Sequence, residues 1–145
     1  MDYRKFGDTY YIRVDRGDEI VGTLLEICRK EGIRSATYEG IGGCAWAEIQ
    51  TLVPEKGGFE TQRLEGTLEL VSLIGNVISE QDGTLYHHTH ALFSYLEAGE
   101  HRHAAGHLKA TAVRYTAEIT LRPVQGGTIF RQYDPETGTG FWKLH

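Results

Sequence analysis

The sequence predicts a single α+β domain in which a mixed or antiparallel β-sheet carries one main helix. Three observations predict this class. The length of 145 residues suits one domain, only one segment has helical periodicity, and most of the remainder reads as strands separated by turns. We expect one domain over residues 1–145, with a core over residues 10–122 and a C-terminal tail over residues 123–145.

The one helix is expected between Glu19 and Glu31. Its apolar residues recur at offsets of 1, 4, 5 and 8, which places them on one helical face. Asp18 is predicted to be the N-cap, and Gly32 stands where a C-terminal cap belongs. The apolar residues of this face are Ile20, Val21, Leu24, Leu25 and Cys28.

Turn signals divide the remaining chain into strands. Gly40-Ile41-Gly42-Gly43 is interpreted as a tight turn with positive φ, because it lacks the spacing of a phosphate-binding loop. Asp82-Gly83 predicts a hairpin, a second turn is expected at Glu97–Glu100, and a bend is expected at Gly75. The predicted strands are Tyr10–Val14, Ile33–Tyr38, Ala45–Val53, Phe59–Leu64, Thr67–Ser79, Leu85–Tyr95, Gly106–Tyr115 and Ala117–Arg122.

Composition narrows the class of protein to a soluble, cytoplasmic one. The net charge of −5 and the lack of any basic block argue against a protein that coats DNA phosphates. No segment approaches the roughly 18 apolar residues of a membrane span, and the first residues lack the features of a signal peptide. Cys28 and Cys44 are expected to be buried free thiols, as in a reducing compartment.

The histidines are the candidate functional residues, since six of the seven lie between positions 87 and 107. His88 and His90 fall on one face of a predicted strand, about 6.5–7 Å apart at their bases. Two imidazoles at that separation can share a metal ion, and His107 on the next antiparallel strand is the expected third ligand. Three neutral imidazoles and one open position are typical of catalytic zinc sites. Zinc is expected first, with iron, nickel or manganese as alternatives.

Other interpretations of the histidines stay open. His101 and His103 repeat the His-x-His spacing and form a rival pair, although they are expected in an exposed loop beside the Gly-Glu turn. His87 points to the opposite face from His88 and is expected to be packed or hydrogen-bonded. The whole group could also be polar residues on the wet face of a sheet, with no metal.

Several stretches in the same order resemble the plant and prokaryote conserved (PPC) domain, in its prokaryotic stand-alone form. The likeness extends from about Tyr10 to Leu121. It implies a homotrimer and a divalent metal held by the residues that match the family's histidines, His88, His90 and His107. The family's fold is similar to that of acetolactate decarboxylase, which carries a three-histidine zinc site. The stretches are Arg16-Gly17-Asp18-Glu19-Ile20, Gly40-Ile41-Gly42, Leu64-Glu65-Gly66, Glu69–Asn76, His88-Thr89-His90-Ala91 and Gly106-His107-Leu108.

The family also carries a DNA-binding label, which this chain supports only weakly. Plant members join the domain to AT-hooks with an Arg-Gly-Arg-Pro core, whereas the only Arg-Gly here, Arg16-Gly17, is followed by two acids. A Gly-Arg-Phe-Glu-Ile-Leu stretch gives plant members their contacts with transcription factors. The matching residues here, Gly66–Val71, lack the arginine.

Two classes of function remain open at this stage. The first is a trimeric binding or regulatory module whose partner is DNA, a protein or a small molecule, and in which metal tunes ligand binding. The second is a metal-dependent lyase or hydrolase acting on a small oxygen-rich acid, in which the metal polarises a carbonyl or activates water. Such an enzyme needs a nearby acid or base, for which the candidates are Glu39, Glu65, Glu69 and Glu118.

Overall fold

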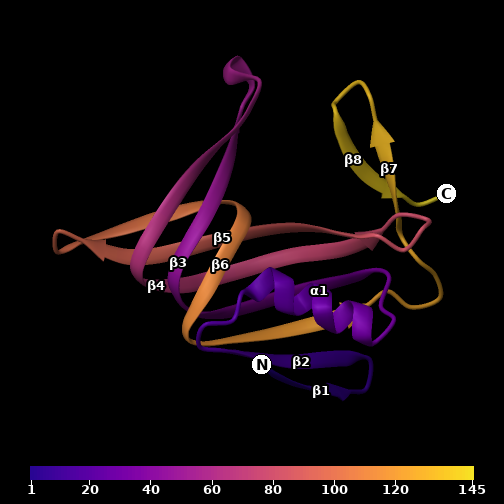
Figure 1. Cartoon of the computed structure of the whole chain (residues 1–145), viewed down its shortest axis with the longest axis horizontal. Helices are drawn as coiled ribbons and strands as arrows, with labels where there is room; N and C mark the ends of the chain where they lie inside the picture. Colours follow the sequence, from indigo (N-terminus) through magenta and orange to yellow (C-terminus); the bar gives the residue numbers. More distant parts are fainter.

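The computed structural model describes residues 1–145, and strands dominate it (Figure 1). The prediction of a sheet with one main helix is confirmed, although strands outweigh the helix more than an even α+β class suggests. The helices are α1 (Ile20–Lys30) and a short 3-10 helix, η1 (Pro54–Lys56). The strands are β1 (Asp2–Phe6), β2 (Thr9–Asp15), β3 (Ala36–Val53), β4 (Gly58–Ser79), β5 (Leu85–Glu97), β6 (Glu100–Pro123), β7 (Phe130–Asp134) and β8 (Thr139–Lys143).

The four longest strands close into a ring. β3 pairs with β4 and β6, and β5 pairs with the same two strands, all antiparallel. β2 extends this ring from β6, and β1 pairs with β2. The β3–β4 hairpin, tipped by η1, and the β5–β6 hairpin both project beyond the ring (Figure 1). The C-terminal β7–β8 hairpin is joined to β4 by one parallel bridge.

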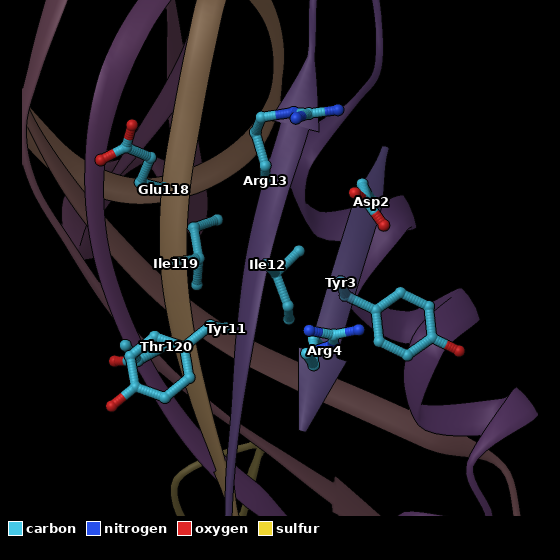
Figure 2. A pocket seen from close by; sticks show the side chains of 9 residues that line it. All are labelled: Asp2, Tyr3, Arg4, Tyr11, Ile12, Arg13, Glu118, Ile119 and Thr120. Atoms are coloured by element: carbon cyan, nitrogen blue, oxygen red, sulfur yellow. The ribbon is translucent and has the colours of Figure 1, made fainter. Parts of the chain in front are cut away.

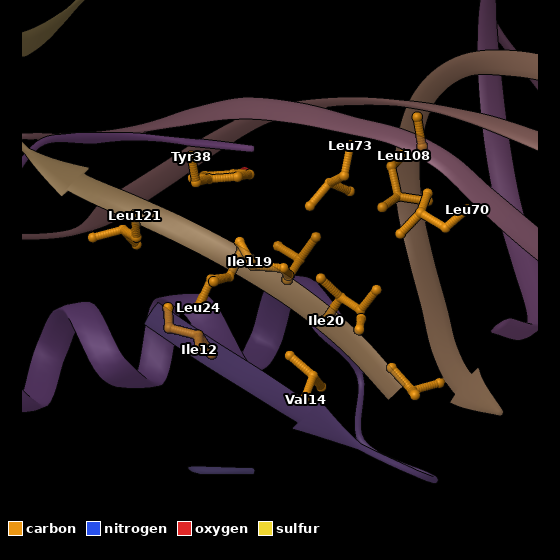
Figure 3. Close-up of a cluster of buried hydrophobic side chains, with 14 of the residues drawn as sticks. Ile12, Val14, Ile20, Leu24, Tyr38, Leu70, Leu73, Leu108, Ile119 and Leu121 are labelled. Atoms are coloured by element: carbon orange, nitrogen blue, oxygen red, sulfur yellow. The ribbon is translucent and has the colours of Figure 1, made fainter. Parts of the chain in front are cut away.

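The core lies between α1 and the inner face of the sheet (Figure 3). The apolar stripe of α1 is buried there, and Ile20, Leu24 and Ile27 have no exposed surface. Phe93 of β5 is equally buried, so the strand that carries the predicted metal ligands also anchors the core with its other face. No helix of this chain is long and apolar enough to cross a membrane.

The N-cap of α1 differs from the prediction. Glu19, not Asp18, caps the helix, and its carboxylate accepts hydrogen bonds from the backbone of Val21 and Gly22. Asp18 instead lies 2.9 Å from the N-terminal ammonium. The longer side chain of Glu19 reaches the first turn from an extended backbone, which leaves Asp18 free for that ion pair. Gly32 has a φ of 67°, as a C-terminal cap requires.

The predicted turn at Gly40–Gly43 is wrong, because β3 runs through it as continuous strand. None of its glycines has a positive φ. A Cβ on Gly40 would lie 2.6 Å from the carbonyl oxygen of Glu118, and a Cβ on Gly42 would lie 2.6 Å from that of Thr116. The glycines therefore let β6 approach β3 closely where the pairing register shifts.

Other predicted breaks also disappear into longer strands. β4 and β6 each run through positions expected to separate two strands, and Gly66 stays within β4 despite a φ of 119°. The register of β4 against β5 shifts between Leu70 and Ser72, not at Gly75. The Asp82-Gly83 hairpin is confirmed, with a φ of 94° at Gly83. β1, β7 and β8 lie outside the range expected for the core.

Candidate metal centre

His88, His90 and His107 converge on the outer face of the sheet. His90 on β5 is the direct register partner of His107 on β6, and His88 lies two residues before His90 on the same face. One ring nitrogen from each histidine lies within 4.8 Å of the others. The His88 and His90 Nε2 atoms are 3.2 Å apart. The structure therefore brings together all three residues that the sequence singled out.

The donor atoms fit a divalent transition metal in spacing and in kind. A tetrahedral ion with bonds of about 2.0–2.1 Å to imidazole nitrogen holds its ligand atoms roughly 3.3 Å apart. The Nε2 separation of 3.2 Å between His88 and His90 matches this value. His88 and His90 are exposed and His107 is half-buried, so a bound ion would be open to solvent on one side.

The protonation state also suits metal binding. Burial lowers the pKa of His88, and the neighbouring His90 lowers it further. Burial likewise lowers the pKa of His107, with smaller contributions from His90 and His88. Both rings are therefore neutral at neutral pH, and only a neutral imidazole has a lone pair to give to a metal.

The inner face of β5 holds the two exposed histidines in place. Thr89, between them, is buried, and its hydroxyl is hydrogen-bonded to the hydroxyl of Tyr38 and to Nδ1 of His87, the latter at 2.9 Å. Gly75 faces Thr89 from β4, and a Cβ there would lie 2.6 Å from the Tyr38 ring. His87 is thus hydrogen-bonded on the inner face, as predicted, and it takes no part in the cluster.

Close packing of β3 and β6 positions the third histidine. Gly106 precedes His107, and a Cβ on it would lie 2.7 Å from the carbonyl oxygen of Gln50. Only glycine permits this approach without displacing a strand. Gln50 is in turn the register partner of His107. The close approach that Gly106 permits therefore fixes the position of His107 relative to β3.

Three neighbours of the cluster could not be found by sequence reasoning. Phe59 on β4 contacts His107 edge-on, Asn76 faces His88, and Ile74 faces His90. All three lie on β4, and no motif marks them. The register of β4 against β5 places Asn76 and Ile74, and the register of β4 against β3 places Phe59. Register is fixed only in the folded sheet.

The rival pair does not form a cluster. His101 and His103 lie within β6, not in the expected loop, and both are exposed. They face Leu96 and Ser94 on β5, neither of which offers a metal ligand. His88 and His90 therefore differ from His101 and His103 in having a third histidine opposite them on the neighbouring strand.

No carboxylate joins the three histidines, whose group contains no other ligand atom. Two of the four candidate acids are engaged elsewhere, since Glu39 pairs with Arg122 at 3.1 Å and Glu65 with Arg63 at 2.8 Å. The other two are Glu69 and Glu118. None of the four candidate acids thus belongs to the three-histidine group.

A large, open hollow lies elsewhere, along β1, β2 and β6 (Figure 2). It has a volume of about 870 Å³ and combines acidic Asp2 and Glu118 with basic Arg4 and Arg13. It is shallow, and no histidine or cysteine lines it. Size alone therefore does not make it the functional site, whereas the histidines converge on one point.

Comparison with known proteins places this chain in a family. Residues 1–125 match the sequence profile of the Plants and Prokaryotes Conserved (PCC) domain, which is most of the chain. The chain belongs to this family. The resemblance to the PPC domain is confirmed, PPC and PCC being abbreviations for one domain. No curated protein matches the sequence.

Solved PPC-like structures cover nearly the whole chain. A PPC protein from Pyrococcus horikoshii is 33% identical, with a TM-score of 0.83 over 99% of this chain and 96% of that one. A metal-containing protein from Archaeoglobus fulgidus is 27% identical, with a TM-score of 0.81 over 99% of both chains. A presumed DNA-binding protein from Bacteroides thetaiotaomicron is 24% identical, with a TM-score of 0.88 over 99% of this chain and 96% of that one, and shows the fold alone.

The likeness to acetolactate decarboxylase is weak. A Staphylococcus aureus protein of unknown function, described as similar to that enzyme, is 11% identical with a TM-score of 0.56. The match covers 83% of this PPC chain and 54% of that one. It concerns the fold and carries no chemistry to the histidines.

Proposed function

We propose that this PPC chain is a homotrimeric metal-binding module in which His88, His90 and His107 hold one divalent transition metal. The observation that carries the proposal is the convergence of the three ring nitrogens within 4.8 Å. The Archaeoglobus fulgidus relative, a metal-containing protein, supports it. Zinc is the expected ion, with iron, nickel or manganese as alternatives. When bound, such an ion supplies a Lewis-acidic centre with a position open to a ligand.

The histidine cluster makes a direct test possible. Protein purified without a His-tag is expected to contain close to one equivalent of metal per chain by elemental analysis. A crystal structure with anomalous scattering would identify the ion and what fills its fourth position. A preparation that contains no metal, and takes up none on addition of zinc, would refute the proposal.

The homotrimer is proposed from the family resemblance, and exposed apolar side chains on the outer face of the sheet support it. Ile41 is 58% exposed, Ile74 is 56% exposed and Val71 is 47% exposed, and they line one shallow hollow on β3 and β4. Exposed apolar surface of this kind is typical of protein interfaces. Light scattering is expected to give three times the chain mass, and high salt is expected to leave the trimer intact. A monomer at micromolar concentration would contradict this.

DNA binding is the function that the description of the Bacteroides thetaiotaomicron neighbour suggests, and it would fit a regulatory module. The charge of −5 opposes it. Lys30 and Arg34 lie close together in the sequence, but both already have contacts within the chain. Arg34 donates to the backbone oxygens of Glu80 and Gln81 at 3.2 Å, and Lys30 lies over the ring of Tyr3. We expect the isolated protein to bind A·T-rich duplex only in the non-specific range of about 10⁻⁴–10⁻⁶ M at physiological salt. Sub-micromolar, sequence-dependent binding by fluorescence anisotropy would overturn this expectation.

The enzymatic alternative, a lyase or hydrolase for a small oxygen-rich acid, requires a general acid or base, and no carboxylate belongs to the three-histidine group. A binding module needs none. The geometry therefore favours ligand binding at the metal over turnover. A cytoplasmic location is a separate proposal, which rests on the two free cysteines.

A further inference from the structure

Phe59 is a large apolar side chain beside the metal-binding histidines, and packing does not explain its position. Its ring lies edge-on to the His107 imidazole, with ring centroids 5.2 Å apart and planes at 88°. The residue is 52% exposed, so most of its ring faces solvent and not the core. An exposed phenylalanine held against a candidate metal ligand is suited to contact whatever binds there.

Strand pairing fixes where Phe59 lies. Gln50 of β3 is the register partner of both His107 on β6 and Thr61 on β4. Phe59 is two residues before Thr61, so it projects from the same face. The hairpin is braced by a hydrogen bond of 3.2 Å from Gln50 Nε2 to Thr61 Oγ1. Phe59 therefore stands on paired strand, which positions a side chain more firmly than a loop does.

The two sides of the cluster differ in polarity. Asn76 is the partner of His88 across β4 and β5, and its Oδ1 accepts a hydrogen bond of 3.4 Å from Trp142 Nε1. A ligand at the histidines would thus meet an amide beside His88 and an aromatic ring beside His107. Imidazole ligands carry no negative charge, so a group of three histidines with no carboxylate leaves the charge of a bound divalent cation uncompensated. That charge favours an anionic ligand.

We propose that Phe59 is a specificity-determining residue, and that the site takes a small carboxylate whose apolar part packs against the Phe59 ring. The inference rests on the metal site proposed above. The cation attracts any carboxylate alike, whereas the ring favours one with a flat, apolar substituent. An acid as small as acetate gains little from Phe59, and an aromatic acid gains the full contact.

Cobalt(II)-loaded protein tests this without any assay of activity, because the visible absorption of the ion changes when a carboxylate enters its coordination sphere. We expect wild-type protein to bind benzoate about three- to tenfold more tightly than acetate. Phe59→Ala should bind acetate as the wild type does and lose the preference for benzoate. Phe59→Leu should retain part of the preference, because it stays apolar.

Leu52→Ala provides the matched control. Leu52 is the register partner of Phe59 and is 55% exposed on the same hairpin, but it carries no aromatic ring. It should keep the preference for benzoate. Equal affinities in the wild type, an unchanged preference in Phe59→Ala or a lost preference in Leu52→Ala would overturn the assignment. Loss of cobalt from Phe59→Ala would also overturn it, since Phe59 would then only support His107. Wild-type protein that takes up no cobalt would refute the metal site, and this inference with it.

Discussion

Two histidine pairs with the same spacing lie on the two strands of one hairpin. His88 and His90 are on β5, and His101 and His103 are on β6. All four are exposed. The first pair faces a third histidine, because His107 is the partner of His90, whereas His103 faces Ser94. The spacing of a pair therefore predicts which side chains share a face, and the register of the neighbouring strand decides whether a metal site is completed.

The residues between the paired histidines differ as much as their partners do. Thr89 is 2% exposed and hydrogen-bonded on the inner face. Arg102 is exposed and pairs with Glu100 at 2.7 Å near the hairpin tip. The first pair thus stands on a strand anchored in the core, and the second stands on a strand that is open to solvent on both faces.

Removal of one ligand should give the largest difference between the pairs. His90→Ala is expected to abolish metal binding, because two imidazoles on one strand hold a divalent ion far more weakly than three. His101→Ala is expected to leave one equivalent per chain. Elemental analysis of tag-free protein measures both, and the opposite pattern would mean that the rival pair is the site.

Completion of the rival pair should give the next largest effect. Ser94 lies four residues after His90 on β5, and its partner His103 lies four residues before His107 on β6. The Ser94–His103 and His90–His107 pairs therefore share one face of the sheet and one type of antiparallel pairing. Ser94→His would therefore place a third histidine opposite His103, as His107 stands opposite His90. We expect a second equivalent of zinc, bound more weakly.

The added site has its own control. In a double variant with Ser94→His and His103→Ala, metal content should return to one equivalent. If Ser94→His alone binds no additional zinc under saturating conditions, strand register is not sufficient to create a metal site. The anchoring of β5 in the core would then be the decisive difference between the two histidine pairs.

Disturbance of that anchoring should have a moderate effect. Gly75→Ala would place a Cβ 2.6 Å from the Tyr38 ring and force a shift behind Thr89. We expect a loss of about 1–3 kcal/mol in the free energy of unfolding, measured by chemical denaturation. Gly58→Ala in the same strand meets open space and should change stability by less than about 0.5 kcal/mol. Equal effects of the two substitutions would show that the Tyr38 ring moves away from the added Cβ with no loss of stability.

The smallest effect is expected from Tyr38→Phe, which removes only the hydroxyl that bonds Thr89. The cost should be about 0.5–1.5 kcal/mol of unfolding free energy. Metal content should remain unchanged, because the ring still fills the space facing Gly75. A large loss of metal from this variant would mean that the hydrogen bond, and not packing, orients the histidine strand.

Local patterns in the sequence predicted much of this fold. The periodicity from Ile20 to Cys28 located the helix, and Asp82-Gly83 located a hairpin, because both depend on neighbours in the chain. Gly40 and Gly42 were assigned wrongly, since the reason for glycine there is the approach of β6, which is distant in sequence. Long-range contacts of that kind leave no local signal.

The candidate site shows the same division. Alternation along β5 predicted that His88 and His90 share a face, and the turn at residues 97–100 correctly implied that His107 returns beside them. Phe59 and Asn76 could not be predicted, because they depend on the register of β4. A one-residue slip in that register would have pointed both side chains to the other face.

His107 also occupies the position at which β6 exchanges one neighbour for another. Up to His107, β6 is paired with β5, and from His107 onward it is paired with β3. An ion bound by both His90 and His107 would link β5 to β6 at this point. Its effect would then fall on local opening of the hairpin more than on global unfolding. Amide hydrogen exchange along residues 90–107 should therefore slow on metal addition, while exchange within α1 stays the same.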